Sequence, residues 1–335
     1  MDTELLVDAG GVFSKFIVAI ETLYHLNVSD NYYLKCIDQR AINSFGENPF
    51  DYILEQPSWY GKPVLDPNKF QRTQCQIYPT FDYSATIEKS PKFSGMSKIA
   101  KSMKLNLEMK ALMDQHTHLV SESVKTIGVH IRATDMHYGH ARLGIWNVDH
   151  YISMVDYVLA TLKQKKIDNV DIFIASDNEE GISKFVERFG KTNNVRFVPN
   201  LSNRVGGWND DSGAFHLRNL TKREYWQDSF LEMYMLSLCN ILIVRTSNLN
   251  NFSRIYYNKD EEQEIIWLPF SNDPIWVRTI YPKILPDIPI TEEEKMIQRK
   301  IELEDAQMRV ERLRKTERRY LYSEKILGPD SNKNK

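Results

Sequence analysis

The chain has 335 residues, of which 42% are hydrophobic and 11% aromatic, which is enough for a large core and, at this length, for about two domains. It carries 43 Lys and Arg against 45 Asp and Glu, and this balance argues against a general nucleic-acid or membrane surface. Any anion that the protein binds must therefore be held by a local group of residues.

Cysteine usage and the N-terminus indicate a compartment. Cys36, Cys75 and Cys239 are widely spaced and form no Cys-x-x-Cys pair, which is typical of reduced thiols and argues against a structural zinc. The first residues are acidic where a leader would be basic, and no apolar run approaches the roughly 20 residues of a membrane span. These features predict a cytoplasmic protein.

The chain opens with a strand, a glycine turn and a helix. Glu4–Asp8 is a short apolar run that leads into Gly10-Gly11, after which apolar residues recur at helical spacing from Phe13 to Tyr24. Paired glycines let backbone amides approach an anion at a helix N-terminus, although such a turn often serves geometry alone. Gly10 and Gly11 are candidate ligand-binding residues. A Walker loop is excluded because Gly-Lys-Ser/Thr is absent.

The rest of the N-terminal half has weaker patterns. Tyr32–Ile37 is predicted to be a second strand. Prolines interrupt residues 45–83 repeatedly, so this region is predicted to be irregular or hairpin-like. Apolar residues along one face then predict a single helix over Ser97–Glu122. The first domain is predicted to end there, at residue 125.

The second half alternates between strands and helices. Strands are predicted at Thr126–Ile131, Val170–Ala175, Val195–Val198, Ile241–Val244 and Ile265–Phe270. Helices are predicted over Val148–Leu162, Glu179–Phe189, Phe230–Leu238 and from Thr246 through Tyr256. This alternation predicts an α/β fold with a parallel sheet over residues 126–290.

The C-terminal residues are predicted to form a separate part. A long charged helix is expected from Thr291 to about Tyr322, with acids in its first turn and only a thin apolar stripe, followed by a disordered tail. Residues 291–335 therefore make up the third predicted region. The helix suits either a solvated surface or pairing with a second copy of the chain.

Charged side chains gather directly after the predicted strand that ends at Ile131. Arg132, Asp135, His137, His140 and Arg142 fall within eleven residues. Ligands of an open α/β sheet bind at the carboxyl ends of its strands, which is where this group lies. A solvated polar loop is the alternative for any one of these residues, but together they predict a site for an anion.

Two more predicted strands end in polar groups. Ser176-Asp177 follows one strand and Thr246-Ser247 follows another, and a parallel sheet would bring both to the edge where Arg132 lies. Hydroxyls and amides at the start of a helix can hold a phosphate. Capping of the helix explains Ser or Thr there equally well.

Several motifs resemble one enzyme family. His130-Ile-Arg-Ala-Thr-Asp135 resembles the His-x-Arg-Arg-x-Asp motif of the α1,6-fucosyltransferases, which include the core and nodulation fucosyltransferases. The similarity continues, in the same order, through Ile174–Asn178, Glu232–Leu238 and Leu242–Tyr256. The resemblance implies an inverting, metal-independent GT-B glycosyltransferase, with two Rossmann-like domains facing a cleft. It also implies a GDP-sugar donor, preferably GDP-fucose, and a glycan acceptor.

The resemblance also implies roles for individual residues. Arg132 would hold the β-phosphate, because a guanidinium matches phosphate oxygens and offsets leaving-group charge. His130 and Glu232 would contact guanine. The remaining donor-binding candidates are Asp177, Thr246, Ser247, Gly10 and Gly11.

Two departures from the family leave the sugar and the acceptor open. Ala133 stands where the family has a second Arg, and Met136 stands where it commonly has Lys. Another GDP-sugar is therefore an alternative donor. A catalytically inactive nucleotide-binding or assembly protein is the alternative function.

Sugar transfer to a hydroxyl needs a base on the acceptor and positive charge at the departing diphosphate. Asp135 is the preferred base and His140 the second choice, with Arg132 at the leaving group. The chain has no Asp-x-Asp, and His137-x-x-His140 on a loop is weak as a zinc motif, so no metal is expected.

Overall fold

The structure is a computed structural model. It describes residues 2–8, 11–28, 31–57, 70–74, 91–131, 148–199, 201, 221–244, 247–257 and 263–267. All of these belong to one compact unit, Met1–Asn272. The predicted charged helix over 291–335 lies outside the described residues, and the predicted boundaries at 125 and 290 stay predictions.

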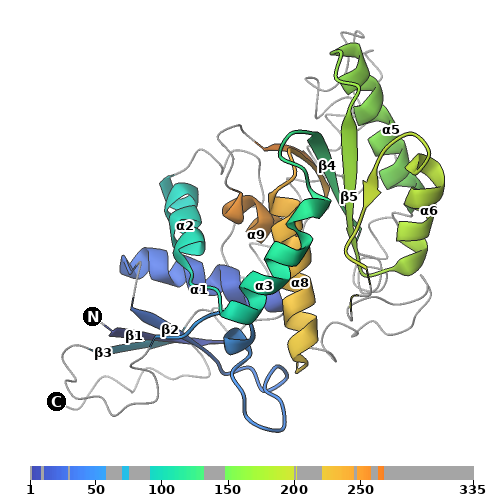
Figure 1. The fold of residues 1–335 in the computed structure, drawn as a ribbon. Coiled ribbons are helices and arrows are strands. Elements are labelled where there is room, and N and C mark those ends of the chain that lie inside the picture. The colour runs from blue at the N-terminus through green and yellow to red at the C-terminus, as the bar shows by residue number, and fades with distance from the viewer. Residues whose placement is uncertain are drawn as a thin grey trace, which may run out of the picture. The chain divides into compact units, whose positions relative to one another are not determined.

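The N-terminal part contains a parallel sheet of three strands, in the order β2-β1-β3 (Figure 1). The strand β1 covers Asp2–Val7, the helix α1 covers Val12–Leu26, and β2 covers Tyr32–Cys36, close to the predicted bounds. Leu5 of β1 pairs with Leu34 of β2, and both side chains are fully buried. Helix α1 crosses between the two strands, which is the connection that a parallel pair requires.

The prediction of an irregular region over residues 45–83 was wrong in one part. A third strand, β3 at Phe70–Gln74, pairs in parallel with β1. Its sequence, Phe-Gln-Arg-Thr-Gln, lacks the apolar alternation that reveals a strand. Among the described residues, β3 is the last strand on its side of the sheet. The short 3-10 helix η1, Pro49–Tyr52, lies in the same region.

The second sheet has five parallel strands in the order β6-β5-β4-β7-β8. Their bounds are Lys125–Ile131 for β4, Val170–Ser176 for β5, Val195–Arg196 for β6, Ile241–Val244 for β7 and Glu264–Trp267 for β8. The central strands are buried over almost their whole length, as continuous apolar runs predict. The predicted α/β class with two Rossmann-like parallel sheets is confirmed, although β6 is shorter than expected.

Helices cover both faces of the five-stranded sheet (Figure 1). On one face, α5 at Val148–Gln164 packs on β4 and α6 at Glu179–Phe189 packs on β5. On the other face, α8 at Arg223–Ser237 packs on β4 and β5 and beside α9 at Asn248–Tyr256. Helix α8 begins earlier than predicted. Within the described ranges, no helix has the length and apolar character needed to cross a bilayer.

The predicted single helix over Ser97–Glu122 is wrong. The structure has α2 at Pro91–Ser102, α3 at Leu107–His116 and the short 3-10 helix η4 at Thr117–Leu119. The break lies where Leu105 forms an antiparallel bridge with Leu54 and the Asn106 side chain accepts a hydrogen bond from the backbone N–H of Met109. Asn106 is thus an N-cap, which starts a new helix.

An aromatic cluster joins α1 to the helices of the second sheet. Phe16 is fully buried, and its ring centroid lies 5.3 Å from Phe50, 5.7 Å from Phe230, 5.3 Å from Phe252 and 6.3 Å from Trp226. These partners come from η1, α8 and α9. One continuous core therefore includes side chains from both sheets.

We predict that Gly128→Ala destabilises the fold. A Cβ at this position in β4 would lie 2.8 Å from Leu242 Cδ2 and 2.9 Å from Cys239 Sγ, so both neighbours must move. Overpacking of this kind costs about 1–3 kcal/mol, which urea unfolding would measure. Gly181→Ala is the matched control. A Cβ at this position would lie 3.5 Å from its nearest neighbours, an ordinary van der Waals distance, and Ala is favoured over Gly in a helix. Equal stability of the two variants would contradict this account.

Candidate functional site

Strand order places the candidate site. The chain runs from β4 to β5 and β6 on one side of the sheet, then returns to β7 and β8 on the other, so the order reverses between β4 and β7. In the smaller sheet it reverses at β1. Crevices for ligands form at the carboxyl ends of strands at such points. A ligand site is therefore expected at the segments that follow β1, β4 and β7.

Several of the predicted site residues lie outside the described residues: Gly10, Arg132, Asp135, His140 and Thr246. The residues that the structure does describe are Gly11, His130, Asp177, Glu232 and Ser247. Roles that depend on the first group stay predictions. The geometry below concerns the second group.

The ends of β4, β5 and β7 lie at one edge of the sheet. Ile131 at the end of β4 pairs with Ser176 at the end of β5, and Val129 pairs with Ile243 of β7. Asp177 directly follows Ser176 and is partly buried. Because the strands are parallel, Asp177 stands at the carboxyl edge, next to the end of β4.

His130 and Glu232 are brought to the same corner of this edge. His130 is 7% exposed and pairs with Ala175, whose side chain belongs to the core that the sheet shares with α8. Glu232 of α8 is 2% exposed, and its carboxylate accepts a hydrogen bond of 3.2 Å from the backbone N–H of Ser176. A buried carboxylate is costly unless it is paired. The backbone N–H of Ser176, at the end of β5, is the partner that Glu232 needs at this position.

Two helices begin at this edge with side-chain caps. Ser247 accepts a hydrogen bond of 3.2 Å from the backbone N–H of Asn250 at the start of α9, and Asn178 accepts one of 2.8 Å from the N–H of Gly181 at the start of α6. The capping interpretation of Ser247 is thus confirmed. Its hydroxyl hydrogen can still be donated to a ligand, since the cap uses the oxygen as acceptor.

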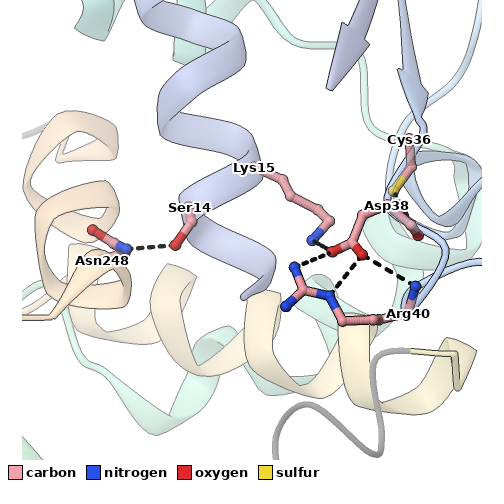
Figure 2. A network of polar contacts seen from close by, with 6 residues as sticks. All are labelled: Ser14, Lys15, Cys36, Asp38, Arg40 and Asn248. Atoms are coloured by element: carbon pink, nitrogen blue, oxygen red, sulfur yellow. Dashed lines mark hydrogen bonds and ion pairs between the residues drawn. The ribbon is translucent and has the colours of Figure 1, made fainter. Parts of the chain in front are cut away.

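Helix α1 reaches this edge from the smaller sheet. Gly11 is its N-cap, in an extended conformation and without a side chain to bond the first amides. Figure 2 shows Ser14 of the first turn facing Asn248 of α9, and the Asn248 amide donates a hydrogen bond of 2.6 Å to the Ser14 hydroxyl. The N-termini of α1 and α9 therefore lie side by side. Both present the positive end of a helix dipole to one region.

A buried ion pair next to this contact was missed from the sequence. Lys15 is fully buried, and its Nζ lies 2.8 Å from Oδ2 of Asp38, which follows β2 (Figure 2). Arg40 holds the same carboxylate with two bonds, Nε to Oδ1 at 2.8 Å and Nη2 to Oδ2 at 3.0 Å. Only Asp38 and Arg40 gave a signal, since Asp38-x-Arg40 directly follows a predicted strand, whereas no local pattern joins them to Lys15.

Asp38 is ionised over the physiological pH range. Burial opposes its charge, but the hydrogen bonds from Arg40 and Lys15 and the positive charge of Lys15 outweigh it and lower the pKa of Asp38 to about 2. The same carboxylate raises the pKa of Arg40. The three side chains are therefore a fixed group with two positive charges and one negative charge.

A cavity of about 680 Å³ lies at the opposite edge of the five-stranded sheet. Val120 and Glu122 line it shortly before β4 begins, and Ser237 and Leu238 line it shortly before β7 begins. It is thus remote from the strand ends where the predicted site lies. In the described ranges, no three His, Cys, Asp or Glu side chains gather as a metal site would require.

Comparisons with known proteins give the following similarities. No family model matches the chain, and no curated protein matches it. Among solved structures it is similar to the α-1,6-fucosyltransferase NodZ soaked with GDP-fucose, with a TM-score of 0.44 and 14% identity over 76% of this chain and 92% of that chain. NodZ from Bradyrhizobium gives a TM-score of 0.43 and 15% identity over the same shares of the two chains.

A plant protein gives a comparable TM-score at lower identity. An Arabidopsis thaliana FUT1 mutant in complex with GDP gives a TM-score of 0.43 and 9% identity over 81% of this chain and 70% of that chain. The NodZ structures are of α1,6-fucosyltransferases, the class that the motifs of this chain resemble. Each score lies below 0.5, so the likeness alone assigns no function to this chain.

We predict that Asp38→Asn destabilises the fold by about 3–5 kcal/mol, because it leaves the buried Lys15 ammonium without its counter-charge. Chemical unfolding would measure the loss. Asp156→Asn is the matched control. It removes an ion pair to Arg188 whose side chains are 39% and 52% exposed, and should cost less than about 1 kcal/mol.

The same pair of proteins gives a pH test. The pKa of Asp38 in the folded state is about 2, below its ordinary value of 3.8. The ionised carboxylate therefore makes its full contribution to stability when the pH is above 3.8. This contribution is lost as the pH falls toward 2. The difference in stability between the wild type and Asp38→Asn should therefore narrow between about pH 4 and pH 2. If the stability difference stays constant over this pH range, ionisation of Asp38 does not stabilise the fold.

Proposed function

We propose that the chain is an inverting, metal-independent GT-B glycosyltransferase that moves fucose from GDP-fucose to a glycan hydroxyl. One observation carries this proposal. The strand β4 is central in its sheet, borders the point where strand order reverses, and ends at Ile131, so that the next residue is the arginine of the family-like motif. A cation at that position suits a diphosphate in the crevice.

The guanine end of the donor is assigned to the corner of His130 and Glu232. Guanine offers adjacent N–H donors on one edge, and a carboxylate is an acceptor that can take both. The Glu232 carboxylate is held at the end of β5 by the Ser176 N–H, 3.2 Å away, and His130 belongs to the same face of the sheet. Uracil offers only one such donor, so this corner favours GDP over UDP.

The reacting end is assigned to the residues that follow β4. In the proposed mechanism Arg132 offsets the charge that develops on the departing diphosphate, and Asp135 takes the proton of the acceptor hydroxyl, with His140 as the second candidate base. Asp177 and Ser247, which follow β5 and β7, are assigned to the donor pocket in this proposal. Glu232 is not assigned the role of base, because its carboxylate is the proposed acceptor for guanine.

We predict that the wild-type protein binds GDP in the presence of EDTA and binds UDP at least about tenfold more weakly, a difference of about 1.4 kcal/mol, as calorimetric titration would show. Incubation with GDP-fucose and a panel of glycan acceptors should release GDP. Binding without any release of GDP would favour the alternative function, an inactive nucleotide-binding or assembly protein. The absence of GDP binding would refute the proposal.

We predict that Arg132→Ala lowers the rate of fucose transfer by on the order of 10²–10³-fold, because one donor of positive charge at the leaving group is lost. The melting temperature should stay close to that of the wild type. Arg132→Lys should recover only part of the activity, since an ammonium lacks the planar fork that matches phosphate oxygens. Turnover retained in Arg132→Ala would remove this residue from the mechanism.

A further inference from the structure

We propose that Arg40 is a second cationic contact to the diphosphate of the donor, presented from the smaller sheet and positioned by Asp38 and Lys15. This inference rests on the proposed function and deepens it. Arg40 is the binding residue in this account. Asp38 and Lys15 are positioning residues, because they act through it.

The location follows from strand pairing. Val7 at the end of β1 pairs with Cys36 at the end of β2, so Asp38 stands at the carboxyl edge of the smaller sheet, as does Asp8 after β1. Lys15 belongs to the first turns of α1, immediately after Ser14. Figure 2 shows the two side chains on different sides of α1: Ser14 faces Asn248 at the start of α9, and Lys15 faces Asp38 and Arg40.

The charges of the group favour an anion. Lys15 is fully buried and is matched by Asp38, and Arg40 adds a second positive charge to the same carboxylate. The three bonded side chains therefore carry a net charge of about +1 at neutral pH. Asp8 attracts Arg40 at longer range and offsets part of this charge, but no hydrogen bond joins the two among the described residues. A diphosphate carries more negative charge than Arg132 alone can balance.

The geometry leaves one edge of Arg40 available. Nε and Nη2 are bonded to Asp38, and the side chain is 56% exposed. Nη1 forms no hydrogen bond within the described part of the chain. A guanidinium clamped along one edge by a carboxylate is already oriented, so less side-chain freedom is lost when its other edge binds oxygen atoms.

The sequence provides a reason for a contact from this side. In the motif that follows β4, Ala133 occupies the position next to Arg132, so that motif contains one guanidinium where the resembled family has two. Arg40 is a guanidinium at the carboxyl edge of the smaller sheet, after β2. A fixed cation there would strengthen GDP binding and would also stabilise the leaving group during transfer.

The test compares Arg40→Gln with the wild type in calorimetric titrations with GDP, GMP and guanosine in EDTA. We expect GDP affinity to fall by about tenfold or more in the variant, as the loss of a charge-assisted hydrogen bond implies. Affinity for guanosine should not change, because it carries no phosphate. Arg40→Lys should recover part of the loss in GDP affinity.

Arg188→Gln is the matched control. Arg188 has nearly the same exposure as Arg40, 52% against 56%, and is also paired with an aspartate, but it belongs to α6 and faces α5. The Arg188→Gln variant should bind GDP with the affinity of the wild type. Melting temperatures of both variants would show whether either change acts through stability.

Three results would overturn the inference. The first is that Arg40→Gln binds GDP as the wild type does. The second is that its affinities for GDP and guanosine fall equally. The third is that only the KM for the acceptor changes, which would assign Arg40 to the acceptor side. In each case the proposed function stands, because wild-type GDP binding and transfer are measured first. A wild-type protein that binds no GDP would refute both.

Discussion

The packing of Phe16 determines how the two sheets meet. Its ring is fully buried between aromatic side chains of η1, α8 and α9, at centroid distances of 5.3–6.3 Å. Burial of one such side chain contributes roughly 1.5–3 kcal/mol, and favourable ring geometry adds to it. Helix α1 begins only four residues earlier, at Val12, so this packing also fixes its N-terminus. The hydrogen bond between Ser14 and Asn248 is a consequence.

Several polar groups of this protein follow the carboxyl ends of parallel strands. The interiors of β4, β5 and β7 are apolar and buried, whereas Asp177, Ser247 and Asp38 follow the carboxyl ends of strands. Charges buried near these ends are paired: Lys15 with Asp38, and Glu232 with the Ser176 N–H. Unpaired, each would cost several kcal/mol. In the proposed function, these groups serve the binding of a charged donor.

Local patterns predicted those parts of the fold that depend on local interactions. The helix α6 has the bounds that its apolar spacing and its Asn178 cap indicate, and β7 has those of its apolar run. The break between α2 and α3 was missed because Leu105 bridges to Leu54, a distant residue that no local pattern reveals. The positions of His130 and Asp177 could be predicted, since they depend only on parallel pairing. The Lys15–Asp38 pair could not, because it joins residues 23 positions apart.

In the proposed site, the two sheets recognise different parts of the donor. The larger sheet contributes His130 and Glu232, whose acceptors and donors can distinguish one base from another. The smaller sheet contributes the uncapped amides after Gly11 and the guanidinium of Arg40, which respond to charge. Neither set distinguishes one sugar from another. Selectivity for the sugar and its acceptor must then come from side chains after Arg132, the segment in which Ala133 and Met136 depart from the resembled family.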